Sequence, residues 1–227
     1  MADLTKKLKV FIRGREDGKT ILDRILPDKS KDSRLEIFNP LNIELGQFIV
    51  LDYVDAERIW APYELDMEYF RRDTWEVVEI LAYTRKAGAA RFPYTLYTLH
   101  DGEDTAYVWA EKEGGDALKL RLLAQRDEFA WDDNPELMDI IESGDTLFDE
   151  ELGVDAVKDA HWTAELVILT RNAQTEPAIE ETEADVHVFF HQREDTTAQS
   201  VLVFEVQEGW VYVLQGAPLN RSEIDVI

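Results

Sequence analysis

Residues 117–125 read ALKLRLLAQ, and their pattern is the clearest guide to the fold class. Leucines at positions 118, 120 and 122 fall on one face of an extended chain, whereas Lys119 and Arg121 fall on the other. Alternation with a period of two is typical of a strand that packs one face on an apolar core. The sequence therefore predicts a β-strand over 117–125.

The same alternation, or a run of β-branched and aromatic residues, recurs along most of the chain. Asp, Gly and Glu separate these runs, as they do in turns. Further strands are expected at 47–54, 75–83, 92–99, 162–170, 186–191, 200–206 and 210–215. Glu208 and Gly209 fall where the turn of a hairpin is expected. The sequence thus predicts a mainly β protein of the α+β class, built from antiparallel sheets.

One short helix is expected between the strands. Asn134 is a good N-cap residue, Pro135 suits the first helical position, and Gly144 is a natural stop. Between them, apolar residues recur at helical spacing, so one face of the helix is expected to be apolar. The residues of that face are Leu137, Ile140 and Ile141. The pattern predicts an amphipathic helix over 135–143.

Two parts of the chain resemble each other. Trp75 and Trp162 each begin a predicted strand, and His100 and His191 each end the next one. The residues that follow the histidines at the same spacing are Glu103, Asp104 and Thr105, and Glu194, Asp195 and Thr196. Repeated units bury their apolar faces against one another, so two similar units of about four strands are expected, with the short helix between them. Chance identity between β-rich segments is the alternative.

Composition divides the chain into four parts. The first contains two short apolar runs, expected to form a strand at 8–12 and a helical turn at 20–26. Residues 172–185 have no apolar pattern and are expected to form an exposed acidic loop. The four parts are an N-terminal segment at 1–34, a first β unit at 35–133, an acidic helical connector at 134–159 and a second β unit at 160–227.

Charge is the strongest compositional feature. Asp and Glu number 48 and Lys and Arg 24, which gives a formal net charge of −24 at pH 7. Thirteen of the acids fall between Asp127 and Asp159, where only Lys158 opposes them. Such a surface repels nucleic acid and anionic membranes, and it attracts basic proteins or divalent cations. High solubility is the plainer explanation of the same charge.

The motifs that would indicate catalysis or metal binding are incomplete or absent in this sequence. Residues 14–20 resemble a phosphate-binding loop, but three residues separate the glycines where the motif needs four. His187 and His191 lie four residues apart in a predicted strand, a span of about 13 Å that is too long for one metal ion. The acids at 127–133 do not fit a calcium-binding loop, and the chain has no cysteine and no Gly-x-Ser-x-Gly motif. No catalytic residue, metal site or cofactor is predicted, and a non-enzymatic role is favoured.

The chain shows no targeting signal. Its first residues lead into no apolar run of the secretory kind, and nowhere do about 18 apolar residues follow one another. The cytoplasm is therefore the expected compartment.

The leading hypothesis is a protein-binding module whose acidic face holds a basic or cationic protein surface, without direct contact to nucleic acid or membrane. An aromatic side chain among acids suits an apolar anchor for such a partner, which favours Trp131. The predicted partner-binding residues are Asp127, Glu128, Trp131, Asp132, Asp133 and Asp139.

Two alternatives stay open. The first is a DNA mimic, in which the carboxylates imitate phosphates and occupy a nucleic-acid-binding protein. The second is a small-ligand-binding or enzymatic module with its site between the two β units. The residues of that second site would be His100, Glu103, His191 and Glu194.

Overall fold

The computed structural model describes residues 38–51, 74–85, 93–112, 117–150, 153–170, 178–191 and 200–227. The predicted strand at 8–12, the predicted helical turn at 20–26 and the glycine-containing stretch at 14–20 lie outside these ranges. The described part contains eleven strands, one α-helix and two 3-10 helices.

The strands account for most of the described chain. Their bounds are β1 Phe48–Leu51, β2 Thr74–Arg85, β3 Tyr94–His100, β4 Thr105–Lys112, β5 Leu118–Ala130, β6 Thr146–Asp149, β7 Val154–Thr170, β8 Ala178–His191, β9 Val201–Gln207, β10 Trp210–Leu219 and β11 Ile224–Val226. The helices are η2 Trp131–Asp133, α4 Pro135–Ser143 and η3 Arg221–Glu223. Every strand predicted in the described part overlaps one of these, so the mainly β class is confirmed.

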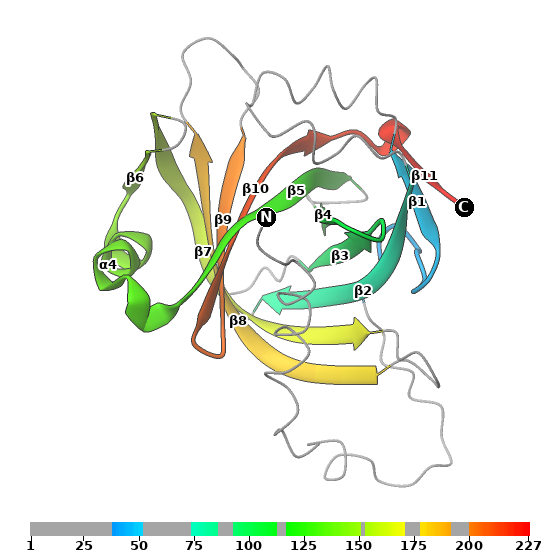
Figure 1. Ribbon diagram of the computed structural model, residues 1–227, viewed down its shortest axis with the longest axis horizontal. Coiled ribbons are helices and arrows are strands. Elements are labelled where there is room, and N and C mark those ends of the chain that lie inside the picture. Colours follow the sequence, from blue (N-terminus) through cyan, green and yellow to red (C-terminus); the bar gives the residue numbers. More distant parts are fainter. Residues whose placement is uncertain are drawn as a thin grey trace, which may run out of the picture.

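The strands form one antiparallel sheet that closes on itself. Their order is β11-β1-β2-β3-β4-β5-β10-β9-β8-β7-β6, and β2 also pairs with β7. This last pairing closes β2, β3, β4, β5, β10, β9, β8 and β7 into an eight-stranded barrel (Figure 1). β1 and β6 pair with the first parts of β2 and β7, outside the barrel. The strands of both predicted β units thus join in one closed sheet.

Aromatic and aliphatic side chains from all eight strands fill the barrel interior. Tyr94 stacks between Tyr83 and Trp109, with ring centroids 4.2 and 4.4 Å away, and Trp162 packs edge-on against Tyr94 and Trp109. Arg121 of β5 lies in the same interior, 4% exposed, with its guanidinium carbon 5.8 Å from the Trp109 ring centroid. The alternation along residues 120–123 of β5 therefore separates an outer core from the barrel interior, and both faces of the strand are buried there.

A buried polar cluster lies among these rings. The Tyr83 hydroxyl donates to Glu205 Oε1 at 2.6 Å, and the Gln207 amide donates to the same carboxylate. Burial raises the pKa of Glu205 above its ordinary value, and the two hydrogen bonds offset that rise only in part. Burial likewise raises the pKa of Tyr83, with a further contribution from the charge of Glu205.

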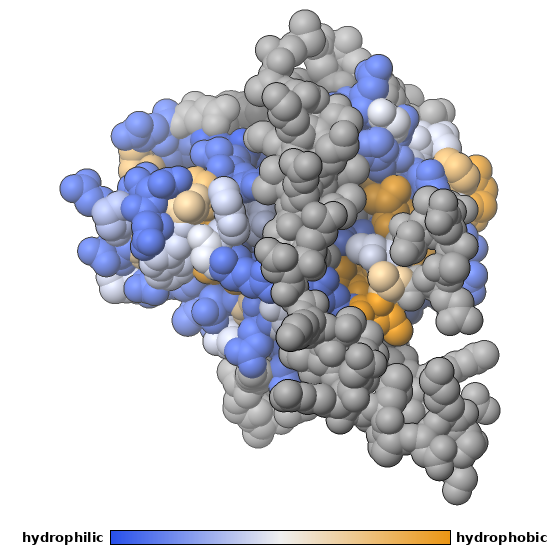
Figure 2. All heavy atoms as spheres, turned by 60° about the horizontal axis from the view of Figure 1, so that its bottom comes forward, coloured by the Kyte–Doolittle hydropathy of each residue, from blue (hydrophilic) through white to orange (hydrophobic). Residues whose placement is uncertain are grey.

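The helix α4 covers the outer face of β8, β9 and β10. Met138 and Ile141 are its buried residues, and they belong to one apolar cluster with Phe189, Phe204 and Val211. α4 and β6 lie together at the left side of the barrel in Figure 1. Mostly hydrophilic residues cover that side of the molecule in Figure 2. The segment between the two predicted β units is therefore packed on the barrel.

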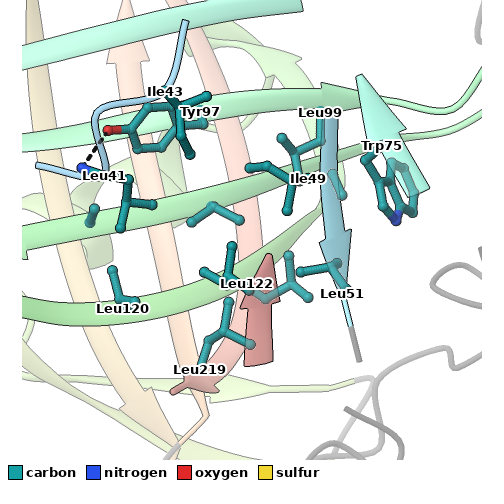
Figure 3. Packing of buried hydrophobic residues seen from close by; sticks show 14 of the residues in the cluster. Leu41, Ile43, Ile49, Leu51, Trp75, Tyr97, Leu99, Leu120, Leu122 and Leu219 are labelled. Carbon is teal, nitrogen blue, oxygen red and sulfur yellow. Dashed lines mark hydrogen bonds between the residues drawn. The ribbon is translucent and has the colours of Figure 1, made fainter. Parts of the chain in front are cut away.

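A second outer cluster covers β2 to β5. The segment before β1 and the strand β1 itself lie over it, as Figure 3 shows. The Leu41 amide donates to the Tyr97 hydroxyl at 3.3 Å, and that hydroxyl donates to Asn39 Oδ1 at 2.6 Å. The buried residues labelled in Figure 3 are Leu41, Ile43, Ile49, Leu51, Trp75, Tyr97, Leu99, Leu120, Leu122 and Leu219. The barrel thus has apolar cores on both sides of its wall.

In the predicted repeat, Trp75 corresponds to Trp162 and His100 to His191. The strand pairing shows that the two tryptophans lie at different places relative to these histidines. His100 pairs with the residue that follows Trp75, whereas His191 pairs with Ala156, six residues before Trp162. Trp75 packs in the outer cluster and Trp162 inside the barrel. The tryptophans are not at equivalent positions, and the two-unit repeat stays a prediction.

The expected acidic loop at 172–185 is wrong for its second half. β8 begins at Ala178, and residues 178–185 pair with β7. Glu181 and Glu183 stay exposed, while the main-chain groups of this part form hydrogen bonds with β7. A strand therefore forms here although its sequence has no apolar face. β7 also begins earlier than expected, at Val154.

The hairpin turn between β9 and β10 is confirmed. Glu208 and Gly209 both have positive φ, 49° and 84°, as a two-residue turn of the primed kind requires. The turn leads β10 back beside β9 and places Trp210 at its start.

Gly216 is a packing requirement of the barrel wall. A Cβ there would lie 2.9 Å from Leu123 Cα and closer still to the Leu122 carbonyl oxygen. Gly216→Ala is expected to lower the free energy of unfolding by about 1–3 kcal/mol, because β5 and β10 must move apart. Urea denaturation measures this loss. Gly209→Asn is the control, since a Cβ there meets nothing within 4 Å and Asn tolerates positive φ; equal losses in both variants would contradict the packing argument.

Candidate functional site

The candidate site is an acidic surface on η2, α4 and the turn that follows α4. Six exposed carboxylates make up this acidic face: Asp132, Asp133, Glu136, Asp139, Glu142 and Asp145. None of the six forms an ion pair with a described residue. The face therefore presents negative charge that the described part of the chain leaves uncompensated.

Local signals place the helix that carries half of these acids. The Asn134 side chain accepts from the Leu137 amide at 3.2 Å, Pro135 is the first helical residue, and the Gly144 amide donates to the Ile140 carbonyl at 2.8 Å. The predicted helix over 135–143 is confirmed with these bounds. Its apolar face differs in one residue: Met138 is buried, whereas Ile140 is 41% exposed.

The two basic residues of this region are turned inward. Lys158 Nζ donates to the carbonyls of Ile141 and Glu142, at 2.7 and 2.8 Å, and so satisfies the end of α4. Arg126 is the extra residue of a β-bulge in β5, and its guanidinium binds both carboxylate oxygens of Asp149. Neither cation is left to neutralise the acidic face.

The structure brings together three of the six predicted partner-binding residues, Asp132, Asp133 and Asp139. Asp127 is exposed on β5, where its carboxylate accepts from the next backbone amide. The Glu128 carboxylate accepts a hydrogen bond from the side-chain amide of Gln125 at 3.1 Å, so it is directed toward Gln125 and not toward the acidic face. Trp131 is half-buried and packs against the apolar cluster beneath α4, so only part of its side chain is accessible for the predicted contact.

The exposed apolar side chains that lie near the acidic face were not predicted from the sequence. Ile140 of α4, Phe148 of β6 and Trp210 of β10 are 41%, 58% and 41% exposed. Trp210 adjoins η2, because it pairs with Ala130. No signal in the sequence indicated Phe148, because residues 146–149 read Thr-Leu-Phe-Asp and do not alternate, whereas in the structure Leu147 and Asp149 are buried and Thr146 and Phe148 are exposed.

The alternative ligand site is not brought together. His100 and Glu103 lie at the hairpin between β3 and β4, where His100 Nδ1 accepts from the backbone amide of residue 102 at 3.0 Å. His191 lies at the opposite end of the barrel, since it pairs with Ala156 near the start of β7. Glu194 lies outside the described residues.

His191 belongs to a buried polar network. Its Nδ1 hydrogen bonds to Ser200 Oγ, and its Nε2 lies 2.9 Å from Asp149 Oδ2, which also binds Arg126. A Ser–His–Asp order is also the order of hydrolytic triads. Here the serine, histidine and aspartate are all buried, so the serine is closed to a substrate. The network instead ties together β5, β6, β8 and the residue before β9.

Two stacked histidines, His161 and His187, lie beside the end of α4. The rings of His161 and His187 stack with centroids 4.1 Å apart. Burial first, then the neighbouring His161 and Lys158, lowers the pKa of His187 to about 4, against the opposing effect of Asp185. His187 is therefore neutral near pH 7. In the described ranges, no three or more His, Asp or Glu side chains are grouped to hold a metal ion.

Fold and surface together define a closed antiparallel β-barrel with an acidic helix packed on its wall. Comparison with known proteins finds no matching family model, curated protein or solved structure. Within the described residues, no helix has the length and apolar character needed to cross a membrane.

Proposed function

We propose that this protein is a non-enzymatic binding module that holds a basic protein surface against its acidic face. The observation that carries the proposal is the set of six exposed carboxylates on η2, α4 and the following turn, beside two cations that are both engaged inside the protein. A basic partner supplies the missing opposite charge, and complementary charge speeds and orients its approach.

Charge and apolar contact have separate roles in this proposal. An exposed ion pair contributes only about 0.2–1 kcal/mol, so a stable complex needs several carboxylates at once. Ile140, Phe148 and Trp210 add exposed apolar area at the margins of the acidic face. We therefore expect an association that depends on salt and whose residual strength at high salt comes from these side chains.

Capture from the cytoplasmic fraction of the source organism tests the proposal. The purified protein is expected to retain a stoichiometric partner at about 0.1 M salt and to lose it near 1 M, where the screening length falls from about 10 to about 3 Å. The triple variant Glu136→Gln, Asp139→Asn, Glu142→Gln is expected to lose most of the partner at low salt.

A matched variant shows whether the position of the charge matters. Glu44, Glu103 and Asp225 are exposed acids on other elements. Neutralising these three changes the net charge equally and is expected to leave capture intact. Equal loss in both triple variants would show a general charge effect, and capture that ignores salt and both variants would overturn the proposal.

A DNA-mimic role is the second candidate, favoured by the regular spacing of acids on α4. Glu136, Asp139 and Glu142 follow at three-residue intervals, which is a rise of about 4.5 Å per step. One strand of duplex DNA carries a phosphate for about every 3.4 Å of helix axis. Release of the captured partner by duplex DNA would support mimicry, and retention would support ordinary protein binding.

A further inference from the structure

β6 is one of the two end strands of the sheet, and within the described residues no strand pairs with its outer edge. It pairs with β7 through Thr146 to Asp149, and the strand order places no described strand beyond it. The Lys158 amide donates to the Asp145 carbonyl at 2.8 Å, which makes residues 145 and 158 a hydrogen-bonded pair. In an antiparallel ladder such pairs alternate, so the main-chain groups of Leu147 also face β7.

The intervening residues have their main-chain groups on the other side. The amides and carbonyls of Thr146 and Phe148 point away from β7, and no described residue hydrogen bonds to them. Both residues are exposed. The edge thus offers two donors and two acceptors at the spacing of a β-ladder.

The surroundings of this edge are acidic. Asp145 precedes β6 and Glu150 follows it, and both are exposed. Asp155 of β7 is exposed and lies directly opposite Phe148, so the two side chains share one face of the hairpin. An extended segment added at this edge would run between carboxylates and beside an exposed aromatic ring.

We infer that the outer edge of β6 receives an extended basic segment of the partner as an added β-strand. The inference rests on the proposed function and names the part of the partner that the acidic face would hold. Main-chain hydrogen bonds to Thr146 and Phe148 supply registration, and alternate side chains meet Phe148 and the carboxylates. A second copy of this chain is the wrong occupant, because it would bring the same acids against one another.

A synthetic peptide tests the inference directly. The probe has about six residues, the usual length of a strand, with lysine and valine alternating. At saturating peptide, hydrogen exchange of the Thr146 and Phe148 amides, followed by NMR, is expected to slow at least about tenfold, because these amides gain acceptors. The same peptide with alternate backbone amides methylated is expected to bind weakly and to protect neither amide.

Two variants of one residue test the edge from the protein side. Thr146→Pro removes an amide that faces outward and leaves the ladder to β7 intact, whereas Thr146→Val keeps that amide. The peptide is expected to bind Thr146→Pro about fivefold or more weakly, as for the loss of one hydrogen bond, and Thr146→Val nearly as well as the parent. The methylated peptide keeps the test valid if the proline variant unfolds.

The outcomes separate this inference from the proposed function. Peptide binding that is lost in the α4 triple variant but leaves both amides unprotected would overturn strand addition and retain the acidic face. Peptide binding that survives the α4 variant but requires the Thr146 amide would retain the edge and count against the acidic face. Absence of peptide binding at low salt would overturn strand addition, whatever the lysate capture gives.

Discussion

Asp149→Ala is expected to lower the free energy of unfolding by about 3–5 kcal/mol, the cost of breaking a buried ion pair from one side. Asp149 is buried and accepts from both Arg126 and His191. Without the carboxylate, a guanidinium and an imidazole stay in place with their main acceptor gone. Urea denaturation followed by circular dichroism measures the loss.

Two further variants check the cause. Asp155→Ala removes an exposed acid of the same hairpin and is expected to change stability by less than about 0.5 kcal/mol. Combining Asp149→Ala with Arg126→Met is expected to recover part of the loss, because the second change removes the cation that the first left unpaired. A loss below about 1 kcal/mol for Asp149→Ala alone would show that the network contributes no more than a surface ion pair.

Lowering the pH is expected to destabilise the native protein because of His187. Its pKa is lowered from 6.5 to about 4 in the folded state, chiefly by burial. The unfolded chain therefore takes up a proton before the native state does. The stability that comes from the neutral ring is complete above pH 6.5 and is lost as the pH falls toward 4, by about 2–3 kcal/mol.

The comparison of His187→Gln with the parent isolates this contribution. The advantage of the parent in free energy of unfolding is expected to shrink steadily between pH 7 and pH 4. Glu205, whose raised pKa gives the opposite trend, is present in both proteins and cancels. His161→Gln is expected to weaken the pH dependence, because the neighbouring His161 contributes to the lowered pKa of His187. A pH-independent difference for His187→Gln would show that the ring titrates as it does in the unfolded chain.

Short-range signals were enough for the local elements. The helix over 135–143 was predicted with its observed bounds, because Asn134, Pro135 and Gly144 act on backbone groups within one turn. The Glu208-Gly209 turn was predicted for the same reason, since it depends on two residues alone. The alternation along β5 correctly indicated a strand.

What each face of a strand meets was decided by closure of the barrel. Arg121 sits on the polar side of β5 in sequence, yet it is buried beside Trp109, because a closed sheet encloses one face and α4 or the β1 region covers much of the other. Trp131 lies among acids in sequence, yet part of its side chain packs beneath α4. Alternation reports that two faces differ; it does not report which of them meets water.

The contacts between distant residues also came only from the tertiary structure. Asp149 and His191 are 42 residues apart, and their contact follows from the register of β6, β7 and β8. The same register puts His100 at the other end of the barrel from His191, which the matching sequence around them did not reveal. The sequence by itself determined the acidic charge, the strand-rich class and the capped helix, because these depend on composition and on neighbours along the chain. The closed sheet alone decided which acids share a surface, which cations turn inward and that β6 lies at an end of the sheet, because these depend on pairing across the fold.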